Sequence, residues 1–313
     1  MKDYKKINMI IPYFGKFPNY FPLFLRSCEM NPTINWTIIS DNQDYYKYPK
    51  NVNFIFMTFE ELKDRVYSLF NFSIYLEHPY KLCDYKPAYG YIFYDLIKDF
   101  DYWGYCDIDV VYGNVRKFLT EDVLKFKKIF VLGHFSLVEN DKSCNEMFMA
   151  TSLYKTVFSN KGSYNFDEEF MNKPNINKIF ESNGIPVYKE SFAADIYTKS
   201  SDFILDYGDS ICENRKNAFF IWNDGKLIRY IEENNRILEK EFMYIHLQKR
   251  KMTINIDMDV CTTFKIIPNS FDNLEIKYSD IYERFNEIVK KHFNLQYYKI
   301  RYKNFLVKVK KFL

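Results

Sequence analysis

Short apolar runs alternate with segments of helical periodicity over the first part of the chain, and this alternation limits the folds open to it. It is typical of βαβ units, in which a helix connects two parallel strands. We therefore predict an α/β fold with a mixed, mainly parallel sheet flanked by helices. Strands are predicted at residues 6–11, 36–40, 52–56, 102–106 and 128–132, and helices at 20–30, 58–70 and 88–98.

Polar residues directly follow three of these predicted strands. Asp41 follows the second strand, Asp107 and Asp109 follow the strand at 102–106, and Gly133-His134 follows the last one. Parallel strands end at a common edge of the sheet, where open α/β proteins bind ligands. We expect these side chains to share that edge.

The second half of the chain is less regular. Apolar runs at 219–222 and 226–230 flank Asn223-Asp224-Gly225, which predicts a hairpin because Asp-Gly supplies the positive φ angles of its turn. A last strand is predicted at 242–245, directly before His246, and a helix at 281–292.

The net charge of +3 is unevenly distributed. Residues 288–313 hold eight Lys or Arg and no Asp or Glu, so the rest of the chain is net negative. A broad nucleic-acid-binding face needs clustered cations to displace counterions from phosphates. We therefore expect no nucleic-acid partner.

Cysteine and apolar patterns indicate the compartment. The six cysteines include no CxxC pair, which is neither a zinc pattern nor a compact disulfide framework. No apolar run approaches the roughly 18 residues of a membrane span, and the run at 7–11 is too short for a signal-peptide core. These features predict reduced thiols in a cytoplasmic protein.

Asp107 and Asp109 form the first candidate site. Two carboxylates converging at a sheet edge repel each other and are costly to desolvate, and a divalent cation removes that cost. Hard oxygen ligands suit Mg²⁺ or Mn²⁺, which bridge the oxygens of a diphosphate. An Asp-x-Asp in a solvated turn is the structural alternative.

A second candidate lies far downstream, where a short strand leads into His246 and the cations Lys249, Arg250 and Lys251. Neutral imidazole is a usual ligand for Mn²⁺, and lysines beyond it would neutralise a departing diphosphate. The alternative is a core histidine with no ligand.

A third candidate is the segment Lys81-Leu82-Cys83-Asp84-Tyr85-Lys86-Pro87, which leads directly into a predicted helix. Alternating charges at a helix start can bind phosphate or sugar hydroxyls with help from the helix dipole. An ordinary N-terminal capping segment explains the pattern equally well.

These motifs together resemble the core of GT-A-type glycosyltransferases, which have a Rossmann-like fold. The resemblance rests on Lys81-x-x-Asp84-x-Lys86, on Gly104-Tyr105-Cys106-Asp107-Ile108-Asp109, and on the segments 11–15 and 244–250. The last two segments are also similar to a bacterial family found in capsule and surface-polysaccharide gene clusters. The departure is Lys86, where many relatives carry an Arg able to make a bidentate contact.

The resemblance implies a metal-dependent hexosyltransferase of residues 1–255, followed by an extension at 256–313. It implies a retaining transfer from a UDP-linked sugar to a lipid-linked saccharide in surface-polysaccharide synthesis, with Mn²⁺ or Mg²⁺ as cofactor. An inverting enzyme would need a carboxylate base, for which Asp167, Glu168, Glu169 and Asp195 are candidates. The implied ligands of the metal are Asp107, Asp109 and His246; those of the donor are Pro12, Tyr13, Asp41, Lys81, Asp107, Lys249 and Lys251; the implied catalytic residues are Asp84, Lys86, Glu168 and Asp195.

Two other functions fit parts of the sequence. In a phosphatase of the haloacid dehalogenase type, Asp107 would be the nucleophile, Asp109 the acid/base, and Gly208-Asp209 a later acidic motif. That motif, however, usually follows the first strand of its domain. A non-catalytic carbohydrate-binding protein is the other alternative, but it needs neither the acidic pair nor the cations after His246.

The basic tail has the pattern of an amphipathic helix over residues 295–313. Its apolar side chains recur at spacings of four and three, and lysines and arginines flank them. Such a helix binds anionic lipid, which predicts a peripheral protein on the inner face of the plasma membrane. Packing on its own domain or on a second subunit is the alternative. The apolar positions are Tyr298, Tyr302, Phe305, Val309 and Phe312.

Overall fold

The computed structural model describes residues 4–169, 172–197, 203–205, 218–248 and 250–289, and in the tail residues 298, 302, 305, 306 and 309. The chain forms two compact units. The first unit comprises Met1–Phe17, Asn31–Ile108 and Arg116–Ser191, and the second comprises Pro18–Met30, Asp109–Val115 and Phe192–Leu313. One of the crossings between them falls between Ile108 and Asp109.

The first unit is built on a seven-stranded sheet in the order β3-β2-β1-β4-β7-β6-β8. The first four of these strands are parallel, and β7 runs antiparallel between β4 and β6. The predicted α/β class, with a mixed and mainly parallel sheet, is confirmed. The strands are β1 Ile7–Pro12, β2 Ile34–Ser40, β3 Val52–Phe56, β4 Tyr102–Cys106, β6 Lys128–Leu132, β7 Phe135–Glu139 and β8 Val187–Tyr188.

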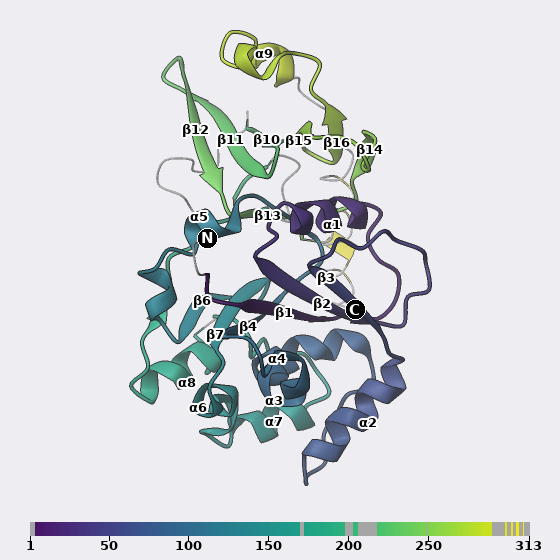
Figure 1. The fold of residues 1–313 in the computed structure, drawn as a ribbon, viewed down its shortest axis with the longest axis vertical. Helices are drawn as coiled ribbons and strands as arrows, with labels where there is room; N and C mark the ends of the chain where they lie inside the picture. Colours follow the sequence, from purple (N-terminus) through teal and green to yellow (C-terminus); the bar gives the residue numbers. More distant parts are fainter. Residues whose placement is uncertain are drawn as a thin grey trace. The chain divides into compact units, whose positions relative to one another are not determined.

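Helices of the first unit pack against this sheet (Figure 1). Helix α2 begins with a capping box, in which the Glu61 backbone N–H donates to Thr58 Oγ1 and the Thr58 N–H donates to Glu61. Aromatic rings supply much of the core beneath the helices, which accounts for the high aromatic content. The helices are α2 Phe59–Leu69, α3 Tyr89–Ile92, α4 Tyr94–Ile97, α6 Lys142–Asn145, α7 Leu153–Ser159 and α8 Ile176–Ser182.

The single helix predicted at 88–98 is wrong. A 3₁₀ helix, Pro79–Ala88, comes first, and Phe93 then leaves the helical region with φ −115° and ψ 35°, which separates α3 from α4. The spacing of apolar residues predicts the buried face of such a segment but not the position where the helix is interrupted. Phe93, at the interruption, is itself fully buried in the core and so fits the apolar pattern.

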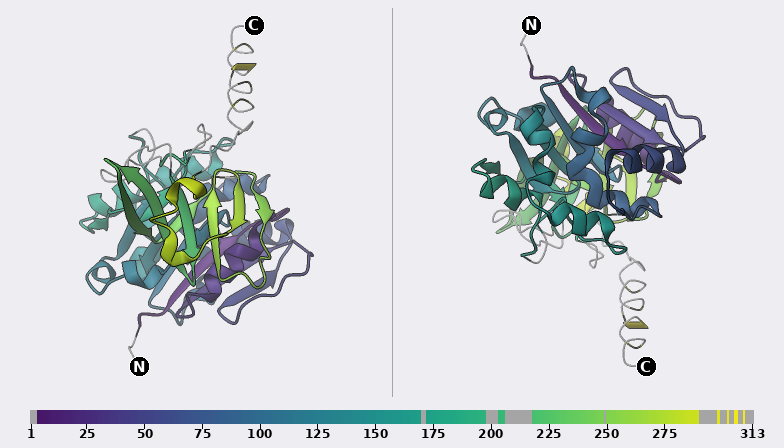
Figure 2. Two further views of the ribbon diagram at one scale, coloured as in Figure 1. Left: turned by 90° about the horizontal axis from the view of Figure 1, so that it is seen from above. Right: turned by 90° about the horizontal axis from the view of Figure 1, so that it is seen from below.

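The second unit contains a six-stranded sheet in the order β12-β11-β10-β15-β16-β14, drawn in green and yellow-green in Figure 2. The predicted hairpin is confirmed, since Asp224 and Gly225 have φ angles of 45° and 79° in its turn. The predicted functional boundary at residue 255 falls inside this sheet. Its strands are β10 Phe219–Asn223, β11 Lys226–Glu233, β12 Arg236–Phe242, β14 Thr253–Asn255, β15 Thr263–Ile267 and β16 Ser270–Asn273.

A small sheet, β5-β13-β9, completes the second unit. It shares a core with helix α1 (Phe21–Glu29) and one face of the six-stranded sheet, whereas α9 (Phe285–Ile288) packs on the other face. The predicted strand at 242–245 is in fact divided at Met243, because β12 ends at Phe242 and β13, which begins at Tyr244, joins the small sheet. Its strands are β5 Val110–Tyr112, β9 Ala193–Asp195 and β13 Tyr244–His246.

Only part of the basic tail is described. Tyr298, Tyr302, Phe305, Leu306 and Val309 are helical, and the predicted stripe position Phe312 lies outside the described residues. Within the described part of the chain, no helix combines the length and the apolar character needed to span a bilayer.

Candidate metal and anion site

The small sheet of the second unit brings three polar residues together. Val110 of β5 pairs with His246 of β13, and His246 pairs in turn with Asp195 of β9. Asp109 directly precedes β5, and its backbone carbonyl accepts a hydrogen bond from the Leu247 N–H at 2.9 Å. The register of three short strands therefore places Asp109, His246 and Asp195 side by side.

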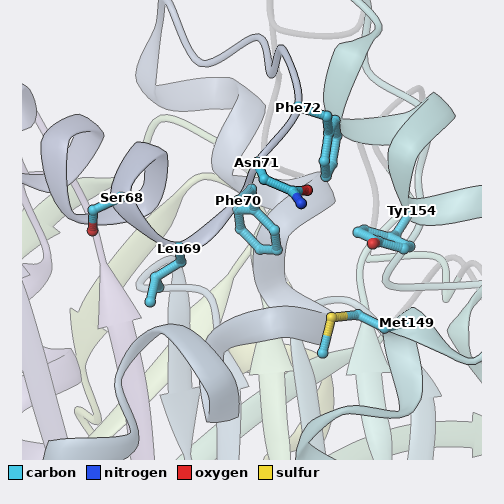
Figure 3. A pocket seen from close by; sticks show the side chains of 7 residues that line it. All are labelled: Ser68, Leu69, Phe70, Asn71, Phe72, Met149 and Tyr154. Carbon is cyan, nitrogen blue, oxygen red and sulfur yellow. The ribbon is translucent and has the colours of Figure 1, made fainter.

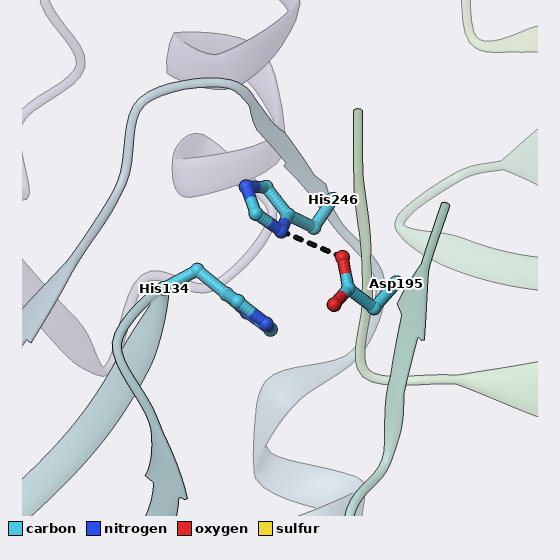
Figure 4. Close-up of side chains that lie close together, drawn as sticks. All are labelled: His134, Asp195 and His246. Atoms are coloured by element: carbon cyan, nitrogen blue, oxygen red, sulfur yellow. Dashed lines mark hydrogen bonds and ion pairs between the residues drawn. The ribbon is translucent and has the colours of Figure 1, made fainter. Parts of the chain in front are cut away.

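His246 lies between the two carboxylates. Its Nδ1 is 2.8 Å from Asp195 Oδ1 (Figure 4), and its Nε2 is 3.4 Å from Asp109 Oδ1. Asp195 also accepts a hydrogen bond from Gln248 Nε2 at 2.7 Å. A carboxylate at Nδ1 holds the proton on that nitrogen and leaves Nε2 to face Asp109.

The charge balance of this group suits a cation. Burial alone would lower the pKa of His246, but Asp109 and Asp195 raise it to about 10. The imidazole is therefore protonated at neutral pH unless another cation replaces its proton.

The donor set also fits a divalent metal ion. Two ligands that each bind a cation at about 2.1 Å must lie within about 4.2 Å of each other. The Asp109 and His246 donor atoms meet this limit, and an imidazole oriented by a carboxylate is the usual support of a metal-bound histidine. The prediction that Asp109 and His246 share a metal is thus compatible with the geometry.

Asp107 takes part in a different cluster, in the first unit. Lys86 Nζ donates to Asp107 Oδ1 at 2.7 Å and to the Gly133 carbonyl at 2.9 Å, and it lies 3.4 Å from Asp167 Oδ2. Burial opposes the charge of Lys86, but the carboxylates raise its pKa well above the ordinary value. A permanent cation therefore holds Asp107, whose side chain is still 38% exposed.

Asp167 and Glu168 lie at the same cluster. Burial raises the pKa of Asp167 to about 7, and Lys86 only partly opposes this. Glu168 is half-buried and accepts from Asn165 Nδ2 at 2.8 Å. A side chain at Gly133 would place its Cβ 2.4 Å from Asp167 Oδ2, so a larger residue here would displace the Asp167 carboxylate.

Lys81 and Asp84 support this cluster from inside the first unit. Lys81 Nζ donates to Asp84 Oδ2, to the Val157 carbonyl and to the Gly162 carbonyl at 2.8–2.9 Å. Asp84 accepts backbone N–H groups of residues 164–166. Both side chains are fully buried, so they anchor the loop leading to Asp167 instead of reaching a ligand, in contrast to the predicted donor-binding and catalytic roles.

The donor residues predicted in the N-terminal strands lie at one edge of the seven-stranded sheet. Pro12 ends β1, and the Tyr13 N–H donates to the Ile39 carbonyl of β2 at 2.9 Å. Asp41, directly after β2, accepts from the Gly15 N–H at 3.0 Å. Asp107 follows β4, the parallel neighbour of β1, so the shared edge predicted for Asp41 and Asp107 is present.

The chain has a family match over residues 9–275, to a family described as of unknown function (DUF6625). The chain belongs to this family. No curated protein sequence matches the DUF6625 chain. Among solved structures it is similar to the galactosyltransferase LgtC in complex with donor and acceptor sugar analogs, and to an active-site mutant of LgtC. For both, the identity is 11%, the TM-score is 0.38 and the match covers 60% of this chain, with 75% and 74% of those chains.

The cations after His246 differ in burial and contacts in this DUF6625 protein. Arg250 is buried, where it donates to Asn269 Oδ1 and to the Tyr197 carbonyl at 3.2 Å. Lys251 is exposed and remains a candidate for anion binding, and Lys249 lies outside the described residues. The motif Gly208-Asp209, which a phosphatase would require, also lies outside them.

Sequence reasoning missed two contributors to the site. One is Gln248, which binds the carboxylate that orients His246. The other is Tyr80, because burial raises the pKa of its hydroxyl and Cys83 and then Asp107 raise it further. The sequence alone does not show the positive φ of Gln248, which is 52°. For Tyr80, the available signal was an aromatic residue directly before Lys81.

Proposed function

We propose that this protein is a metal-dependent glycosyltransferase that uses a nucleoside-diphosphate sugar. The observation that carries the proposal is the buried pair of Asp109 Oδ1 and His246 Nε2, 3.4 Å apart, with Asp195 on the other ring nitrogen. Asp109 lies two residues after Asp107, which follows β4 at the sheet edge where Asp41 follows β2.

Under this proposal Asp109 and His246, with Asp107, hold Mn²⁺ or Mg²⁺, which when bound supplies positive charge to the diphosphate leaving group. Asp195 keeps the His246 ring in one tautomer. Lys86 fixes the position of Asp107 and compensates its charge. Exposed Lys251 adds a cation for the diphosphate, and Tyr13 and Asp41 contact the nucleoside.

The transfer is proposed to retain the anomeric configuration. Asp195, a predicted base, is occupied by His246 and Gln248, so it suits the role of a positioning residue. Asp167 is buried beside Lys86, and one oxygen of Glu168 binds Asn165. These contacts favour a mechanism that needs no carboxylate base next to the acceptor.

The proposed acceptor is a lipid-linked saccharide at the inner face of the plasma membrane, in surface-polysaccharide synthesis. Exposed aromatic side chains of the tail are consistent with contact to lipid headgroups. Tyr298, Tyr302 and Phe305 are 61%, 65% and 60% exposed. Co-sedimentation of the full chain with anionic vesicles, compared with a chain ending at residue 292, tests this part separately.

Calorimetric titration with UDP in the presence and absence of Mn²⁺ tests the main proposal. We expect UDP binding that requires Mn²⁺ in the native protein and is lost in Asp109→Asn, while Asp259→Asn, an exposed aspartate of the same unit, behaves like the native protein. UDP binding independent of metal, or hydrolysis of p-nitrophenyl phosphate lost in Asp107→Asn, would contradict it. The second result would instead support the phosphatase.

A further inference from the structure

A surface pocket of about 330 Å³ lies in the first unit, after the end of α2. Its lining comes from two separate segments, the loop that follows α2 and the region around the start of α7 (Figure 3). Its volume is at the lower limit for small-molecule sites. The lining residues are Ser68, Leu69, Phe70, Asn71, Phe72, Met149 and Tyr154.

Aromatic rings that pack on the core of the first unit form part of the pocket lining. Phe70 packs on the buried core, with ring centroids 6.2 Å from Phe148 and 5.4 Å from Phe158. Phe72 and Tyr154 stand nearly perpendicular to each other, 5.5 Å apart at 79°. All three lining rings are only partly buried, and Lys155 Nζ lies over the Phe72 ring, 5.9 Å from its centroid.

Polar groups beside these rings are available for hydrogen bonds. Within the described residues, the Asn71 amide and the Tyr154 hydroxyl make no hydrogen bond, and Figure 3 shows the amide directed to the side of the pocket where Phe72 and Tyr154 lie. None of the lining side chains carries a charge.

We propose that this pocket binds an uncharged saccharide, separately from the metal and anion site. A sugar ring has apolar C–H faces that pack on aromatic rings and hydroxyls that pair with an amide and a phenol. A nucleotide or free phosphate would require several cations, whereas the cation shown beside these rings is a single lysine, Lys155, over Phe72. If the proposed transferase function holds, the pocket anchors a remote residue of the acceptor; the binding itself does not depend on that function.

Methyl NMR of the full-length protein provides a direct test, because Met149 lines the pocket. With ¹³C-methyl methionine labelling, Met149→Leu identifies its signal among those of the ten methionines. Titration with lactose and with maltose should shift the Met149 signal in a saturable way with at least one of them. Neither disaccharide requires Mn²⁺ to bind, so the shift should persist in Asp109→Asn.

Variants of the lining separate a built site from surface adsorption. Asn71→Ala and Tyr154→Phe should each weaken the saccharide at least threefold, and Phe72→Ala at least tenfold, whereas Tyr94→Phe, an exposed tyrosine elsewhere in the first unit, should change nothing. Thermal unfolding of each variant checks its fold. Absence of a Met149 shift up to 100 mM of both sugars, equal binding by all variants, or a shift with cyclohexanol but neither sugar would overturn the proposal.

Discussion

Asp107 and Asp109 are separated by one residue, yet they are compensated in opposite ways. In the first unit, Asp107 binds the permanent cation Lys86 at 2.7 Å. In the second unit, Asp109 faces the Nε2 of His246, whose charge is a removable proton. A carboxylate that is already paired with a lysine gains little stabilisation from binding a metal ion. A carboxylate that faces an imidazole can bind a metal ion together with that imidazole as the second ligand. The metal preference of this motif should therefore reside mainly in Asp109.

The largest expected effect separates the two aspartates directly. Asp109→Asn should lower kcat/KM about a thousandfold, because a metal ion contributes several kcal/mol of charge stabilisation that an amide ligand does not support. Asp107→Asn should weaken Mn²⁺ far less, by about tenfold or under. Electron paramagnetic resonance of free Mn²⁺ measures both affinities. Equal loss of Mn²⁺ in the two variants would contradict the comparison.

The pairing of Lys86 with Asp107 and Asp167 predicts an effect on the stability of the fold. Lys86→Met should lower the free energy of unfolding by about 1–3 kcal/mol, because Asp107 loses its hydrogen-bonded cation and the buried Asp167 takes up a proton in place of its ion pair. Adding Asp167→Asn should restore part of this loss. Lys125→Met removes an exposed ion pair with Asp122 and should leave stability nearly unchanged. Urea unfolding compares the three; an unchanged stability of Lys86→Met would show that the cluster is solvated.

On the histidine side, Asp195→Asn tests orientation without touching a proposed ligand. The amide no longer enforces the Nδ1–H tautomer, so Mn²⁺ affinity should fall about 10–100-fold. The pH profile should change together with the affinity, which a purely structural role would not require. If Mn²⁺ binds to Asp195→Asn as to the native protein, His246 does not need this support.

The last effect concerns protons. A metal ion must displace the proton of His246, whose pKa is about 10, so Mn²⁺ affinity should rise about tenfold per pH unit between pH 6 and 8. Calorimetry in two buffers of different ionisation enthalpy should count one proton released. His246→Gln should remove the slope, and a pH-independent native affinity would exclude the imidazole as ligand.

The expectation that polar residues after parallel strands share one edge of the sheet predicted part of this site. It located Asp41, Asp107 and Asp109, because an apolar run followed by a carboxylate is a local signal, and it paired Asp109 with His246 through chemistry. It could not assign Asp195, whose position depends on the register of β9 with β13. Lys81 and Asp84 carry the same local pattern as exposed ligands, and only the packing of residues 157–166 around them shows that they are buried.

The pairing of β5 with β13 also sets when the site can form. On a ribosome, Val110 emerges long before His246, by roughly ten seconds at typical elongation rates. Until then β5 has no partner on the His246 side, and Asp109 is an unbalanced negative charge. Under the proposed function, truncated or stalled chains that lack β13 would therefore carry the complete Asp-x-Asp motif and still bind no metal, so the motif would become functional only once β13 has been synthesised.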